Sequence, residues 1–127
     1  NRLLKEVVSK DGTGKAAALK NVEVCGKTGT SRDYKDNWFV GMTPEYSCTV
    51  WYEEKSPEAY IENESPVIFH NILKNMKIDT QKEFPDCKNV VKMKYCKKTG
   101  LIANEHCAET ADGYYNVKNV PDVCTCE

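Results

Sequence analysis

The stretch that decides the fold is VEVCGKTGTSRDYKDNWFVGMTPEYSCTVWY, residues 22–52. It contains three runs rich in β-branched and aromatic residues, at 22–29, 38–43 and 48–52, and such runs are typical of strands. The connectors between the runs are short, and the second one places Pro44 where a tight turn favours proline. Because parallel neighbours would need a long crossover, these connectors predict an antiparallel meander.

Helical patterns precede and follow this sheet in the sequence. Residues 2–9 place their apolar side chains on one helical face, and the glycine-containing loop at 11–14 ends the segment. Residues 16–19 form either a short helical turn or a packed connector. After Pro66, which suits a first helical turn, apolar residues recur at helical spacing as far as Met76. The sequence therefore predicts an α+β fold, an antiparallel sheet meander with flanking helices.

The character of the sequence changes after residue 78. Polar residues, isolated cysteines and turn signals such as Asp112-Gly113 predict a small, loop-rich, cysteine-containing tail with one or two short strands, such as residues 90–96. We therefore expect two units, residues 1–78 and 79–127. The second is too small to fold well without additional cross-links.

The composition restricts the classes of partner. The 127-residue chain carries 18 Lys and Arg against 19 Asp and Glu, and this near balance argues against nucleic acid. No apolar run approaches the ~20 residues that span a bilayer, and no signal-peptide pattern opens the chain. No cofactor is predicted. Because the chain begins at Asn1, we expect a piece of a longer protein whose missing part determines membrane attachment and location.

Cysteine is abundant in the tail. Of the seven cysteines, five lie in the last third of the chain, namely Cys87, Cys96, Cys107, Cys124 and Cys126. This clustering favours disulfides and an oxidising, extracytoplasmic location. There is no Cys-x-x-Cys, and the two histidines, His70 and His106, lie in different segments, so we predict no metal site. A metal-binding cysteine cluster stays as a weaker alternative. Cys25 and Cys48 are expected to be small apolar thiols in the core.

The candidate binding element is Lys27-Thr28-Gly29-Thr30, at the end of the first strand. Side chains alternate along a strand, so Lys27 and Gly29 share one face while Thr28 and Thr30 share the other. An edge lysine offers a point charge and three donors to a carboxylate, and Gly29 lets a peptide backbone lie close. The backbone N–H of Thr30 is a candidate oxyanion donor. The alternative is a solvated lysine at a strand edge; a second copy of the motif, at 98–100, indicates only a turn.

Several segments in order resemble the end of the transpeptidase domain of bifunctional (class A) penicillin-binding proteins. These segments are residues 12–17, 24–31, 36–46 and 49–52. Lys-Thr-Gly is one of three short motifs shared by these proteins and the serine β-lactamases. The resemblance covers residues 1–78. Residues 96–107 and 121–124 are similar to the cysteine-bearing extension of some Gram-positive members.

The resemblance implies a partial penicillin-binding fold with the Lys-Thr-Gly motif on the edge strand beside the cleft. The parent enzyme would cross-link peptidoglycan stem peptides through a serine of Ser-x-x-Lys, and β-lactams would trap its acylated state. Lys27 and Thr28 would help to position the stem peptide or the drug, and Thr30 would bind its carboxylate. The N–H of Thr30 would complete the oxyanion hole. The implied location is the extracytoplasmic side of the bacterial cell membrane.

The catalytic pattern is incomplete in this chain. None of its serines has a lysine three residues later; they are Ser9, Ser31, Ser47, Ser56 and Ser65. Ser-x-Asn is also absent. Because a nucleophile must lie within hydrogen-bond reach of its base, we expect that the chain alone cannot be acylated. The alternative function is a non-catalytic cell-wall or protein-binding module.

Two further expectations concern residues around the sheet. Trp38 and Trp51 are expected to pack in the core, as strand aromatics usually do. Tyr34, Asp36 and Asn37 either line the mouth of the cleft or form an ordinary polar turn. Without the rest of a transpeptidase, one face of the sheet would be bare, which favours self-association.

In the tail, we expect a Cys96–Cys107 disulfide that closes a short loop. Cys124 or Cys126 is the candidate partner of Cys87. The loop closed by the Cys96–Cys107 disulfide would stabilise the folded chain by about 3 kcal/mol, because the cross-link constrains the unfolded state.

Overall fold

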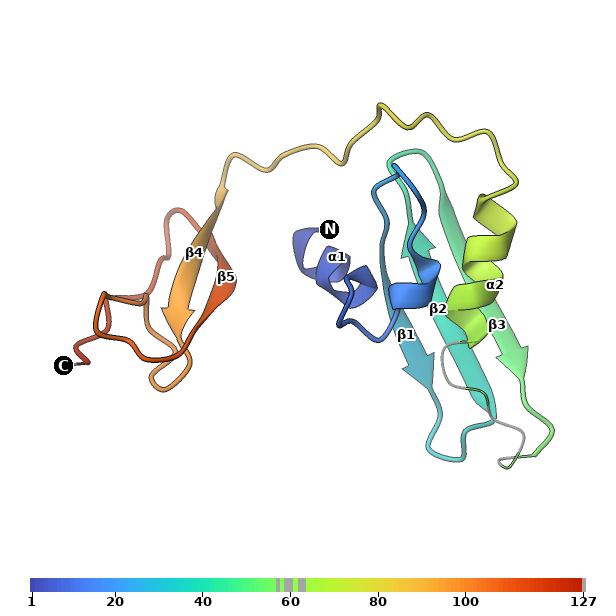
Figure 1. The fold of residues 1–127 in the computed structure, drawn as a ribbon, viewed down its shortest axis with the longest axis horizontal. Coiled ribbons are helices and arrows are strands. Elements are labelled where there is room, and N and C mark those ends of the chain that lie inside the picture. The colour runs from blue at the N-terminus through green and yellow to red at the C-terminus, as the bar shows by residue number, and fades with distance from the viewer. Residues whose placement is uncertain (57, 59–60, 62–63, 127) are drawn as a thin grey trace. The chain divides into compact units, whose positions relative to one another are not determined.

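The computed structural model describes residues 1–56, 58, 61 and 64–126, and it divides the chain into two compact units, Asn1–Phe84 and Pro85–Glu127 (Figure 1). Residues 79–84 belong to the first unit through polar contacts. Glu45 accepts a hydrogen bond from the backbone N–H of Asp79 at 2.8 Å and forms an ion pair with Lys82 at 2.6 Å. The backbone N–H of Phe84 donates to Glu23 at 2.7 Å.

The first unit contains the predicted meander. Strands β1 (Cys25–Thr30), β2 (Asp36–Met42) and β3 (Ser47–Glu53) pair antiparallel in the order β1-β2-β3. The register places Trp38 of β2 between Gly29 and Trp51. Short connectors therefore join neighbouring strands, as the sequence predicts.

Helices close one face of this sheet. α1 (Arg2–Val8) contacts β1, while α2 (Glu64–Leu73) contacts β2, β3 and the 3-10 turn η1 (Lys15–Ala17) (Figure 1). The core contains Phe39 and Phe69, both fully buried, with ring centroids 5.0 Å apart in an edge-to-face arrangement. Val8, Val50 and Leu73 complete the contacts between sheet and helices. The predicted α+β fold is confirmed.

The opposite face of the sheet is open to solvent over β2 and β3. Trp38, Val40 and Trp51 are 41%, 45% and 50% exposed, although Phe39 between them is buried. Side chains on a strand alternate between faces, so burial of Phe39 directs both of its neighbours away from the core. The prediction that Trp38 and Trp51 are core residues is therefore wrong. Their rings instead contact each other, with centroids 5.9 Å apart.

The second unit is a hairpin with long loops. β4 (Val90–Cys96) is the predicted strand, and it pairs antiparallel with β5 (Thr110–Asn116), a second strand whose position the sequence does not predict. Asp112-Gly113 suggested a turn, yet Gly113 lies opposite Met93 within the ladder. A Cβ at Gly113 would come within 2.6 Å of the Tyr115 hydroxyl, so a larger residue here would displace the Tyr115 ring.

No helix among the described residues is both long enough and apolar enough to cross a membrane.

The Phe39→Ala substitution tests this account of the core. We expect it to lower the free energy of unfolding by about 3–5 kcal/mol, because it removes a fully buried ring from between sheet and helices. Val40→Ala, the next residue on the open face, should change stability by about 0.5 kcal/mol or less. Urea denaturation followed by circular dichroism measures both; equal losses in the two variants would contradict the assignment of faces.

Candidate functional site

The motif Lys27-Thr28-Gly29-Thr30 lies on β1, which is an edge strand of the sheet. Just beyond the strand, the N–H of Ser31 donates to the carbonyl oxygen of Asp36 at 3.0 Å. Hydrogen-bonded pairs alternate along an antiparallel ladder, so the N–H groups of Thr28 and Thr30 point away from β2. The outer edge of β1 therefore presents backbone donors and acceptors.

Lys27 and the nearby hydroxyl groups gather along this edge. Lys27 is exposed, and its Nζ donates to the carbonyl oxygen of Thr28 at 2.9 Å and lies 3.5 Å from the Thr28 hydroxyl. That hydroxyl is 3.1 Å from the hydroxyl of Thr13, which precedes η1 in the chain. Among the described residues, no carboxylate forms an ion pair with Lys27. The arrangement can bind an anion such as a carboxylate through one ammonium group and two hydroxyls.

Gly29 leaves space beside the lysine. A Cβ at Gly29 would meet only Trp38 of the neighbouring strand, at an ordinary contact distance of 3.4 Å. The packing of the sheet therefore does not require glycine here, whereas the close approach of another backbone would. Thr30, the next residue, is exposed.

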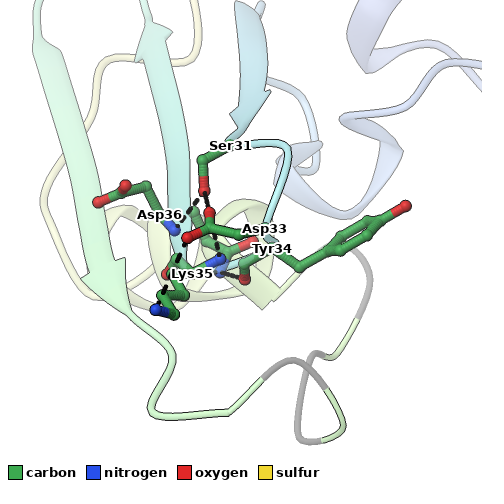
Figure 2. A network of polar contacts seen from close by, with 6 residues as sticks. Ser31, Asp33, Tyr34, Lys35 and Asp36 are labelled. Atoms are coloured by element: carbon green, nitrogen blue, oxygen red, sulfur yellow. Dashed lines mark hydrogen bonds and ion pairs between the residues drawn. The ribbon is translucent and has the colours of Figure 1, made fainter.

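The connector from β1 to β2 is held by its own polar network (Figure 2). The Ser31 hydroxyl donates to Asp33 at 2.6 Å and accepts from the backbone N–H of Asp36 at 2.9 Å. The hydrogen bond from Ser31 lowers the pKa of the Asp33 carboxyl below its usual value. Tyr34 adopts a positive φ of 60°, and its ring points away from the network (Figure 2).

Asn37 has a structural position in this turn. Its side chain is buried, and Nδ2 donates to the carbonyl oxygens of Tyr34 and Lys35 at 3.2 and 3.3 Å. Asp36 accepts a hydrogen bond from the indole of Trp51 at 3.0 Å. Of the three residues considered for the cleft mouth, Asn37 and Asp36 therefore stabilise the hairpin, and Tyr34 is exposed at its tip.

The second Lys-Thr-Gly copy does not belong to any sheet edge. Lys98, Thr99 and Gly100 form a turn after β4, where Gly100 has a φ of +76° and donates its N–H to the carbonyl oxygen of Cys96 at 2.8 Å. Its glycine supplies a left-handed conformation. This is the turn that the sequence predicts.

All seven cysteines are free thiols in the structure. Cys25 is fully buried, as expected, and burial raises the pKa of its thiol; Cys48 is half-buried with the same effect. Cys87, the expected partner of Cys124 or Cys126, is exposed.

The structure brings together four cysteines of the second unit. The Sγ atoms of Cys96, Cys107, Cys124 and Cys126 all lie within 4.8 Å of one another, a group that can hold a metal ion. The expected Cys96–Cys107 pair falls inside this group. Hydrogen bonding by Thr99 lowers the pKa of both Cys96 and Cys124. The group contains no Cys-x-x-Cys pattern, because its members come from three separate segments of the chain.

Comparison with known proteins identifies the family. The model of the penicillin-binding protein transpeptidase domain matches residues 1–74, which is more than half of the chain. The chain belongs to the penicillin-binding protein transpeptidase family.

The relatives are much longer proteins. The chain is 32% identical to penicillin-binding protein 1A of Clostridium perfringens over 121 residues, covering 90% of this chain and 14% of that protein. It is 44% identical to penicillin-binding protein 4 of Bacillus subtilis over 71 residues, covering 52% of this chain and 11% of the relative. Penicillin-binding protein 1A of Clostridium botulinum is 55% identical over 49 residues, covering 39% of this chain and 6% of the relative. The chain thus spans about a seventh or less of the length of these three proteins.

The hairpin beside the motif can be tested through Asn37→Ala. This substitution removes the amide donor from the carbonyl oxygens of Tyr34 and Lys35, although the Lys35 oxygen still accepts from the N–H of Glu54 at 2.7 Å. We expect a loss of about 1–3 kcal/mol in the free energy of unfolding. Lys35→Ala is the matched control: its ion pair with Asp33, at 3.8 Å, is exposed to solvent, so its loss should leave the stability unchanged. Chemical denaturation of the two variants measures the free energy of unfolding of each. If the Asn37→Ala chain were as stable as the Lys35→Ala chain, the Asn37 side chain would not stabilise this turn.

Proposed function

We propose that the first unit supplies the substrate-binding edge strand of a peptidoglycan D,D-transpeptidase, an enzyme that cross-links cell-wall stem peptides by serine acyl transfer. One observation carries the proposal. In a member of the penicillin-binding transpeptidase family, exposed Lys27 and the outward-directed N–H of Thr30 lie on the same sheet edge.

Each group has a distinct task in this reaction. The stem peptide lies along the outer edge of β1 as an added strand, with Gly29 removing the side chain that would block it. Lys27 and the hydroxyls of Thr28 and Thr30 bind the terminal carboxylate of the stem peptide or of a β-lactam. The N–H of Thr30 donates to the oxyanion that forms when a serine attacks the D-Ala-D-Ala carbonyl, a contribution worth roughly 3–4 kcal/mol in serine hydrolases.

The serine itself comes from outside this chain in the proposed mechanism. No Ser-x-x-Lys or Ser-x-Asn occurs among the 127 residues. The serine would form an ester with the penultimate D-Ala and release the terminal D-Ala. An amine of a second stem peptide would then attack the ester, form the cross-link and regenerate the serine. β-Lactams would stop the enzyme at the acylated stage.

The open face of the sheet fits a place inside a larger domain. Trp38, Val40 and Trp51 are exposed on the face to which the ladder also assigns Lys27. We propose that the remainder of a transpeptidase domain covers these residues and brings the serine to Lys27. In the isolated chain, the same apolar surface favours self-association.

The proposed location follows from the substrate. Peptidoglycan cross-linking takes place outside the cytoplasmic membrane, so we place the complete enzyme on the extracytoplasmic side of the bacterial cell membrane. Its anchor and its glycosyltransferase module, which the resemblance to class A members implies, would lie in other parts of that protein.

The chain alone should form no covalent adduct with penicillin. Incubation with a fluorescent penicillin, followed by denaturing electrophoresis, is expected to show no labelled band, because no serine here is paired with a catalytic lysine. A native penicillin-binding protein run in parallel verifies the reagent. Stoichiometric labelling of the chain would overturn the proposal that the acylated serine comes from outside this chain.

A chimera tests the binding strand directly. The chain replaces the matching 121-residue region of the C. perfringens penicillin-binding protein 1A, and acylation by fluorescent penicillin is timed. Lys27→Ala should slow acylation by about tenfold or more, because it removes the cation that holds the carboxylate. Lys98→Ala, in the second Lys-Thr-Gly copy, is the control and should acylate at the unaltered rate. Equal rates for the two variants would reject the role of Lys27.

A further inference from the structure

Four cysteines from three segments of the second unit meet at one point. Cys96 ends β4, Cys107 lies in the loop that leads to β5, and Cys124 and Cys126 lie in the C-terminal segment. Backbone pairing brings these segments together, because Ile102 bridges both to Tyr95 and to the segment that carries Cys124.

The distances between the sulfur atoms bracket the spacing in a tetrahedral metal centre. Four thiolates bound to zinc at about 2.3 Å have sulfur atoms about 3.8 Å apart. The Sγ atoms of Cys96 and Cys126 are 3.9 Å apart, those of Cys124 and Cys126 are 3.1 Å apart, and no pair in the group exceeds 4.8 Å. We propose that Cys96, Cys107, Cys124 and Cys126 form a structural zinc site that holds the second unit together.

The surroundings of the sulfur atoms suit thiolate ligands. The backbone N–H of Asn104 points to Cys107 Sγ at 3.4 Å, and that of Cys126 points to Cys124 Sγ at 3.4 Å. The Thr99 hydroxyl donates to Cys124 Sγ at 3.2 Å. Such donors orient sulfur ligands and offset their negative charge.

Asn104 also joins two of the segments that carry the ligands. Its Nδ2 donates to the carbonyl oxygens of Cys124 and Cys126 at 2.9 and 3.0 Å. This amide therefore positions the C-terminal cysteines against the loop of Cys107. It is a positioning residue for the proposed site.

Zinc binding by four thiolates creates a negative charge, and charged residues lie beside the proposed site. Zn²⁺ and four thiols give a tetrathiolate complex of charge −2 and four released protons, one of them the proton that Cys107 donates to Asn104 Oδ1 at 3.2 Å. Lys97, Lys98 and Glu109 line a hollow beside Cys96 and Cys126. Lys97 forms an ion pair with Glu109 at 3.7 Å, so the ammonium group of Lys98 offsets one charge of the complex.

The unit needs such a cross-link. In the described part of Pro85–Glu127, only Cys96, Ile102 and Cys124 are buried, and two of these three are members of the sulfur group. A core this small does not stabilise an independent unit, and a structural metal is one of the devices that small domains use. Four protein ligands also close the coordination sphere, which distinguishes a structural site from a catalytic one.

Metal content of the whole chain is the primary test. The 127-residue protein is purified under reducing conditions with added zinc, desalted, and analysed by inductively coupled plasma mass spectrometry. We expect about one zinc ion per chain. Cys96→Ser and Cys124→Ser should retain about tenfold less zinc, whereas Cys87→Ser, which alters the exposed cysteine outside the group, should retain the full amount.

Cobalt provides a second readout on the unaltered chain, since removal of Cys96 or Cys124 also removes a buried side chain. Co²⁺ should produce the thiolate charge-transfer and tetrahedral ligand-field absorption of a four-sulfur site, and zinc should abolish both. Chelation should accelerate proteolysis within 85–126 while leaving the first unit resistant.

Three outcomes would overturn the proposal. They are a reduced protein that binds neither zinc nor cobalt, equal zinc content in Cys96→Ser and Cys87→Ser, and disulfides among the four cysteines in non-reduced peptide digests of protein isolated without added oxidant.

Discussion

Phe39 contributes a fully buried ring to the core that joins the sheet to both helices, and the placement of the candidate site follows from that burial. Gly26 on the neighbouring strand makes room for the ring, because a Cβ there would lie 2.6 Å from Phe39 Cζ. Side chains alternate along strands, so burying Phe39 also decides the face of each residue on β1 through the ladder. Lys27, paired with exposed Val40, is thereby directed away from the core. A slip of one residue would bury the lysine.

Much of this arrangement was predictable from local patterns. The strands and helices of the first unit followed from apolar periodicity and short connectors, and the edge position of Lys27 followed from the first strand. Trp38 and Trp51 were misassigned because an aromatic run in a strand does not reveal which of two alternating faces is covered. The position of β5 does not follow from the sequence because Asp112-Gly113 resembles a turn, while pairing with β4 decides its conformation.

The remaining features depend on contacts between distant parts of the chain. The Thr13 hydroxyl meets that of Thr28 only after the glycine-containing loop folds back onto β1. The four-cysteine group likewise requires Ile102 to pair with two other segments, and no spacing rule in the sequence expresses such pairing. Asn37 was considered for the cleft because it is polar; its burial under two turn carbonyls appears only in three dimensions.

The exposed tryptophan pair gives the first unit an intrinsic optical probe. Trp38 and Trp51 lie with ring centroids 5.9 Å apart on the face assigned to Lys27, and they are the two tryptophans of the chain. Indole emission shifts to shorter wavelength when water is replaced by protein. Any molecule that covers this face therefore changes the fluorescence of the unmodified protein, so docking at the lysine-bearing side of the sheet is observable without a label.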